Sequence, residues 1–238
     1  SPMHAMFNAV SEQYSPYSPS SRLFLNPLYA APQRILGDKP VERAIAEAGL
    51  QDEIARLEGL DLIDWSAVSA TKQRLLRSLH GHFSSRDNEL SRDFARFRKK
   101  GGASLEQHCR FEALHGYMLK NQQVHSWQQW PLSFRNPDSD AVQQFAVEHA
   151  QEVDYHMFCQ WLIACGLERA QSVARNAGMA IGLISDLAVG ADGAGSLAWS
   201  RQSELLSAVS VGAPPDIINS QGQNWGVSAL SPWGLQES

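Results

Sequence analysis

One carboxylate in the sequence lies where enzymes often place chemistry. Asp186 interrupts a short apolar run, AIGLISDLAV at 180–189, which is typical of a buried parallel strand. Barrel and open-sheet enzymes carry reactive side chains at the carboxyl ends of such strands. A charge there is costly unless it is paired or faces a cleft. Asp186 is therefore either a site residue or a capping residue that begins the next turn, and both readings stay open.

A second carboxylate, Asp216, ends the string GAPPD at 212–216. The two prolines fix the backbone and position the carboxylate at small entropic cost, although a rigid surface turn explains them equally well. The string QNWG at 223–226 follows. Amides that bond hydroxyls, beside an indole face, suit a sugar with its apolar C–H face and polar rim, but tryptophan is as often a core residue. These residue types favour a carbohydrate cleft.

Other patterns give weaker indications of chemistry. The three cysteines do not cluster, so a metal or redox role is not expected. His149 and His156 share a helix face, but they have no third ligand and are expected to pack or form hydrogen bonds. The string GADGAGS at 190–196 lacks the glycine order of a phosphate-binding loop, and there is no Gly-x-Ser-x-Gly elbow. We expect no metal and no organic cofactor.

The elements that must position these residues change character along the chain. X-Pro steps keep the first 35 residues extended, so an ordered loop is expected there. Apolar residues then follow helical spacing as far as residue 177. The expected helices begin near Pro40 and after Asp64, end at Lys99–Gly102 and near 122, and run unbroken from 138–140 to 176. Strand patterns at 180–189 and 208–211 come last, which favours an α/β protein with a helical insertion.

Composition limits the functional class. The 238 residues carry a formal charge of −5, which offers no electrostatic support for nucleic-acid binding. Few cysteines fit a reducing compartment, no apolar run is long enough for a membrane span, and the N-terminus carries no basic-then-apolar signal. We therefore expect a soluble, cytoplasmic protein. Because the chain opens at Ser1-Pro2 and ends without a terminal element, we also expect a piece of a longer protein.

Four motifs, taken in order, resemble those of bacterial amylomaltases, which are 4-α-glucanotransferases among the glycoside hydrolases. They are Tyr14–Arg22 with Leu25-Asn26-Pro27, then Gly182–Gly190, Ser210–Asp216 and Gly222–Gly226. Order and approximate spacing agree, and the helical block falls where that family inserts a subdomain. Two departures are Ser185, where relatives often carry arginine, and Val227-Ser228, where many carry a proline-containing sequence.

The resemblance implies a partial (β/α)8 TIM barrel with a large α-helical insertion subdomain. Residues 1–35 would be a barrel segment with the first active-site loop, 36–177 the insertion, and 178–238 a second barrel segment. It also implies transfer of α-1,4-glucan segments between maltodextrins by a retaining double displacement, which uses two carboxylates about 5 Å apart.

Residue roles follow from the same resemblance. Tyr17 would face the donor sugar, and Asn26 and Asp186 would shape the same cleft. Asp216 and Trp225 would lie on loops along the glucan path. Gln223 is expected to bind substrate beside them because its amide can bond sugar hydroxyls, which is an inference from its chemistry.

The family's catalytic carboxylates belong to later motifs. Neither Arg-Ile-Asp-His nor Gly-Glu-Asp-Leu occurs here, so the catalytic residues are expected beyond Ser238 and the isolated chain is expected to be inactive. Its partners would be maltodextrin and the remainder of its own barrel, with no nucleic acid and no membrane. Two alternatives stay open: a non-catalytic maltodextrin-binding or helical interaction module, and a hydrolase that differs only in how well water is excluded.

Overall fold

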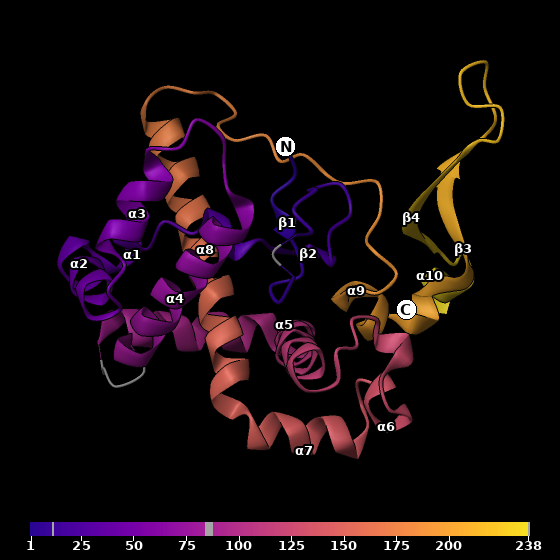
Figure 1. Cartoon of the computed structure of the whole chain (residues 1–238), viewed down its shortest axis with the longest axis horizontal. Coiled ribbons are helices and arrows are strands. Elements are labelled where there is room, and N and C mark those ends of the chain that lie inside the picture. Colours follow the sequence, from indigo (N-terminus) through magenta and orange to yellow (C-terminus); the bar gives the residue numbers. More distant parts are fainter. Residues whose placement is uncertain (11, 84–87, 238) are drawn as a thin grey trace.

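The computed structural model describes residues 1–10, 12–83 and 88–237. Helices form most of the molecule, with a small sheet from the N-terminal residues at its centre and a separate β-hairpin at one edge (Figure 1). The expected order of loop, helical block and strands is confirmed at this coarse level. Among the described residues, no helix is both long and apolar enough to cross a membrane.

The N-terminal segment is extended, as the X-Pro steps predict. Its two short strands, β1 (His4–Ala5) and β2 (Ser21–Leu25), pair antiparallel. A single turn, η1 (Pro27–Tyr29), follows, and the first α-helix, α1, covers Pro32–Leu36. The chain between the strands is the first loop, defined as residues 6–20 without residue 11, which lies outside the described part.

The helical block begins close to where the sequence predicts. Asp64 caps α4, because its Oδ1 accepts a hydrogen bond of 3.0 Å from the Ala67 amide. The helices of the block are α2 (Asp38–Glu47), α3 (Gln51–Glu58), α4 (Trp65–Phe83), α5 (Glu89–Gln122), α6 (Leu132–Arg135), α7 (Asp140–Glu148) and α8 (Ala150–Asn176), with the turn η2 (Trp127–Gln129) before α6.

Two helix breaks test the predicted boundaries. The predicted stop at Lys99–Gly102 is confirmed as a kink inside α5, where Gly102 has a φ of 52°. The unbroken helix expected from 138–140 to 176 is wrong, because His149 (φ −112°, ψ 31°) separates α7 from α8. The apolar spacing continues across this break, so periodicity alone could not reveal it.

The core lies between α4, α5 and α8. Four aromatic side chains, Phe83, Phe94, Phe158 and Trp161, pack with ring centroids 5.1–6.2 Å apart. Burying a large apolar side chain contributes roughly 1.5–3 kcal/mol. The middle of α8 is buried on all sides, which makes this helix the axis of the block.

The C-terminal part follows α9 (Ser196–Ser200) and η3 (Gln202–Glu204). Strands β3 (Leu205–Ala213) and β4 (Gln223–Leu230) form an antiparallel hairpin, and α10 (Gly234–Glu237) ends it. The predicted strand at 208–211 is confirmed within β3. The strand β4 was not predicted, because its sequence was read only as a binding loop.

The buried parallel strand predicted at 180–189 is wrong. This segment has no assigned strand, and Ile181, Ile184 and Leu187 are 68%, 85% and 66% exposed. An apolar run becomes a strand only when neighbouring strands pair with it, and none of the described strands pairs with this one. Asp186 therefore does not end a buried strand.

Candidate functional site

Two of the sequence motifs, and the hairpin that carries the other two, meet at residues 188–192. On one side, the Asp192 amide donates to the Pro19 carbonyl of the first loop at 2.8 Å. On the other, the Ser228 amide of β4 donates to the Ala191 carbonyl at 2.8 Å. The chain at 188–192 thus joins the first loop to the hairpin by backbone hydrogen bonds. This junction is the frame of the candidate site.

Glycines make this close approach possible. A Cβ at Gly195 would lie 2.4 Å from the Ser20 carbonyl oxygen, and one at Gly190 would lie 2.8 Å from Cβ of Val227. Gly190 and Gly195 of the GADGAGS string therefore serve backbone packing. This packing role was not predicted from the sequence, although the small residues of the string are a signal for it.

Ser20 fastens the first loop to the helical block. Its hydroxyl accepts from the Ser196 amide at 2.9 Å, and the Ser196 hydroxyl lies 2.8 Å from Nδ1 of His108 on α5. All three side chains are buried. The C-terminal end of the first loop is therefore held by hydrogen bonds that run from Ser20 through Ser196 to His108 in the core.

Glu112 supports the same loop from α5. Its side chain is 1% exposed, and Oε2 accepts from the Asn8 amide at 3.2 Å. Burial raises the pKa of Glu112 to about 8, while hydrogen bonds from Asn8 and Ser20 oppose this shift. Glu112 was not predicted from the sequence as a functional residue, although a glutamate on the apolar face of a helix is a recognisable signal.

Tyr17 lies in the exposed part of the first loop. It is 62% exposed, within a turn closed by the Ser18 amide and the Ser15 carbonyl at 3.3 Å. Its neighbour Tyr14 stacks on Trp65 of α4, with ring centroids 5.6 Å apart and planes 11° apart. The helical block therefore anchors the loop while the Tyr17 ring faces solvent.

Asn26 and Asp186 lie close to one histidine. Asn26 is buried, caps η1 through a 3.0 Å bond to the Leu28 amide, and lines a small pocket with His4. Asp186 is half exposed, 3.7 Å from the Ser1 amino group, and its charge acts on His4. Burial lowers the pKa of His4, the Arg22 charge lowers it further, and the Asp186 charge opposes both. The structure thus brings Asn26 and Asp186 to one part of the molecule.

Asp216 organises its own loop. Its Oδ1 accepts from the amides of Ile218 and Asn219 at 2.8 and 2.6 Å, and these bonds lower the pKa of the carboxyl group. The loop between β3 and β4 extends away from the helices (Figure 1). The structure thus agrees with the interpretation of the Pro-Pro-Asp string as a rigid surface turn, because the Asp216 side chain forms hydrogen bonds within its own loop.

Gln223 and Trp225 form a pair on β4. Residues two apart on a strand share a face, and the Trp225 indole N–H donates to Oε1 of Gln223 at 2.9 Å. The indole is 44% exposed. An open aromatic face beside an amide is suited to stacking against a sugar ring and bonding its hydroxyls. Among the described residues, no group of three His, Cys, Asp or Glu side chains could hold a metal ion.

Comparisons with known proteins give one consistent family. The model of glycoside hydrolase family 77, described as 4-alpha-glucanotransferase, matches residues 1–238. The 4-alpha-glucanotransferase of Mycobacterium tuberculosis strain H37Rv is 37% identical over 221 residues, which cover 92% of this chain and 29% of that protein.

Solved structures agree in fold. The amylomaltase from Corynebacterium glutamicum is 29% identical with a TM-score of 0.74, covering 99% of this chain and 31% of its own. The amylomaltase from Streptococcus agalactiae, solved in complex with acarbose, is 15% identical with a TM-score of 0.76 over 99% of this chain and 46% of that one, which supports the fold alone. This chain spans less than half the length of each of these relatives.

Proposed function

Because the chain belongs to the 4-alpha-glucanotransferase family, we propose that it supplies substrate-binding loops to an enzyme that transfers α-1,4-glucan segments between maltodextrins by a retaining double displacement. The observation that supports this most directly is that the first loop and the hairpin are both joined by backbone hydrogen bonds to residues 188–192. Loops positioned by a rigid scaffold are where binding residues concentrate.

The proposed architecture is a partial (β/α)8 barrel. Residues 1–35 and 178–238 would be its barrel segments, and 36–177 the helical insertion. The TM-score of 0.74 to an amylomaltase over 99% of the chain supports this arrangement. In such a barrel, the exposed apolar side chains of 180–189 would be covered by neighbouring strands.

The proposed residue roles follow from exposure and chemistry. Tyr17 faces the donor sugar with its exposed ring, and Asp186 accepts hydrogen bonds from sugar hydroxyls beside Asn26. Trp225 stacks on a more distant sugar with Gln223 as its polar partner. Asp216 contributes by keeping the hairpin loop in one shape.

The nucleophile and the acid/base are proposed to lie outside these 238 residues, because neither expected carboxylate string occurs in the sequence. The partners of this chain are then maltodextrin and the rest of its barrel. The free thiols Cys109, Cys159 and Cys165 suit a cytoplasmic location.

An activity assay tests this proposal. The 238-residue chain and the longest natural protein that contains it are each given maltotriose, and glucose and longer maltodextrins are separated by chromatography. We expect transfer products only from the longer protein. Products from the isolated chain would place the carboxylate pair within it, and hydrolysis without longer products would favour the hydrolase. Binding without turnover by the longer protein would favour a non-catalytic maltodextrin-binding module.

A further inference from the structure

The segment that carries Asp186 is held at one point. Its apolar side chains at 181, 184 and 187 face solvent, and among the described strands it has no pairing partner. Ala188, in contrast, is 2% exposed. A chain without strand pairing needs other hydrogen bonds to stay in one place, and the structure provides them two residues after Asp186.

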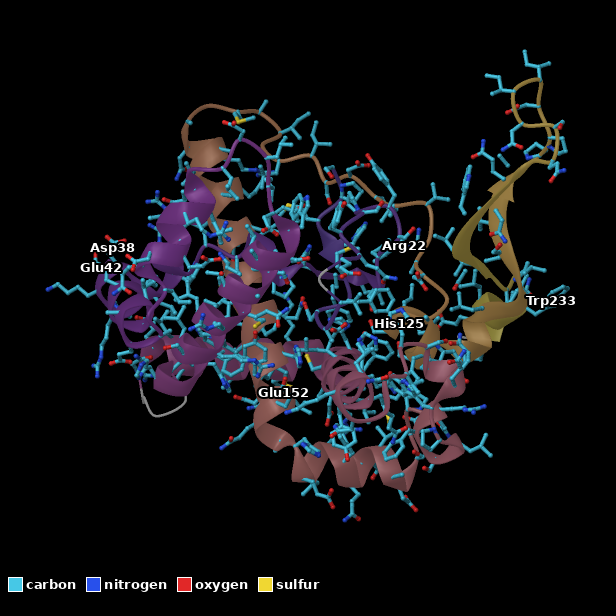
Figure 2. The ribbon with its side chains drawn as sticks, viewed as in Figure 1. Arg22, Asp38, Glu42, His125, Glu152 and Trp233 are labelled. Carbon is cyan, nitrogen blue, oxygen red and sulfur yellow. The ribbon has the colours of Figure 1, made fainter. Side chains whose placement is uncertain are left out.

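Arg22 and His4 supply these bonds from the N-terminal sheet. Nη1 of Arg22, on β2, donates to the carbonyls of both Ala188 and Val189 at 3.0 Å. Nε2 of His4, on β1, accepts from the Ala188 amide at 3.2 Å. Arg22 lies where the N-terminal strands meet the chain that leads from α8 to α9 (Figure 2). We call these two side chains, with the Ala188–Val189 backbone, the clasp.

The clasp joins two candidate binding segments. Arg22 lies between Tyr17 and Asn26 in the sequence, so its strand is continuous with the first loop. All contacts that Arg22 makes in the clasp are to backbone atoms, so they fix the path of the chain independently of the side chains at 188 and 189. Asp186 is close enough to influence His4 electrostatically. The clasp therefore fixes the backbone two residues after Asp186 against the strands that flank the first loop.

From this geometry we propose that Arg22 is a positioning residue for glucan binding, holding the Asp186 segment against the first loop with His4 as its second support. The role in glucan binding rests on the proposed function, whereas the ordering of the segment does not. A guanidinium suits this task because one nitrogen can donate to two carbonyls from a fixed plane.

The clasp requires a neutral His4. Only an unprotonated Nε2 can accept from the Ala188 amide. The charged groups that act on His4 are Arg22 and Asp186, and its lowered pKa keeps the ring neutral at neutral pH. Acidification through the titration of His4 should therefore release one of the two supports, and Arg22 would hold the segment alone.

The test combines local hydrogen exchange with glucan affinity. Exchange at the Ala188 amide and maltoheptaose affinity are measured by NMR for the 238-residue chain, for Arg22→Met and for Arg22→Lys. Arg22→Met should speed Ala188 exchange by about tenfold or more and weaken maltoheptaose binding several-fold, with exchange in the middle of α8 unchanged. Arg22→Lys keeps a charged donor, so its Ala188 exchange rate and its maltoheptaose affinity should lie between those of the unsubstituted chain and Arg22→Met. It also replaces Arg22→Met in the test if that variant does not fold.

Arg169→Met is the matched control, because Arg169 likewise donates to a backbone carbonyl, that of Arg34 at 2.6 Å, away from the clasp. It should leave both measurements unchanged. The proposal is overturned if Arg22→Met leaves Ala188 exchange unchanged, if exchange rises without loss of affinity, or if Arg169→Met has the same effects. If the unsubstituted chain binds no glucan, affinity is measured instead on the longer natural protein that contains it and on its Arg22→Met and Arg169→Met variants. Failure of that protein to bind glucan would reject the proposed function, while the exchange data still decide the ordering role.

Discussion

The position of a single residue in this fold can determine its charge state. Glu112 is the clearest case, because its carboxyl group is buried under the first loop and its pKa is raised to about 8, from an ordinary value of 4.5. Between these two pH values the folded state keeps a proton that the unfolded state has lost. Stability should therefore fall as pH rises through this window, by at most about 1.4 kcal/mol per pH unit.

Glu112→Gln should remove this pH dependence, because a neutral amide replaces the neutral acid. Urea unfolding of both proteins between pH 5 and 9 measures the difference between their free energies of unfolding. We expect this difference to shift in favour of the variant as pH rises towards 8 and then to level off. A constant difference across the range would mean that Glu112 is ionised in the folded protein.

The exposed pair on β4 gives a second prediction at this scale. Trp225→Ala should weaken maltoheptaose binding by about tenfold, since it removes the stacking face, and should change the free energy of unfolding by less than about 1 kcal/mol, since the indole is 44% exposed. Titration by NMR and urea unfolding measure the two effects. Trp233→Ala is a control of the same residue type, because that side chain is 70% exposed outside the candidate site. An equal loss of affinity in both variants would argue against a sugar platform at Trp225.

At the scale of elements, the junction between the first loop and residues 188–196 depends on a glycine. Gly195→Ala would bring a methyl group within 2.4 Å of the Ser20 carbonyl oxygen, whereas Gly193→Ala, in the same loop, finds only an ordinary 3.5 Å contact. We expect Gly195→Ala to lose about 1–3 kcal/mol of stability through overpacking and Gly193→Ala to lose much less. Thermal unfolding of the two variants checks this, and equal losses would contradict the packing role.

The helices were predictable from the sequence because their signals are local. A cap such as Asp64 and a break such as Gly102 act within one turn, so their positions follow from neighbouring residues. The segment 180–189 was not predictable in the same way. Its apolar run indicates burial, but the partner strands that would bury it are set by distant sequence, and none of the described strands pairs with it.

The same distinction between local signals and long-range contacts applies to the residues of the candidate site. Residue chemistry alone identified Asp186, Asp216 and the Gln223–Gly226 string, whereas Tyr17 and Asn26 came from the family resemblance. Neither approach found Arg22 or Glu112, whose importance depends on contacts 166 and 104 residues away in the sequence. Long-range pairing of this kind leaves no trace in a local pattern.

At the scale of the whole molecule, the central claim is that three separate motifs form one glucan-binding surface. The supporting contacts are the backbone bonds that join Pro19, Asp192, Ala191 and Ser228. If the motifs act together, a maltodextrin should perturb all of them with the same concentration dependence. If the hairpin is independent, it should respond alone or not at all.

The measurement that tests this most directly is a maltoheptaose titration of the isotope-labelled 238-residue chain, with backbone amide shifts followed by NMR. We predict that amides at 14–26, 186–192 and 223–228 shift together and fit one dissociation constant, while amides in the middle of α8 stay in place. Shifts confined to one of these segments, or separate dissociation constants for the first loop and the hairpin, would contradict the account.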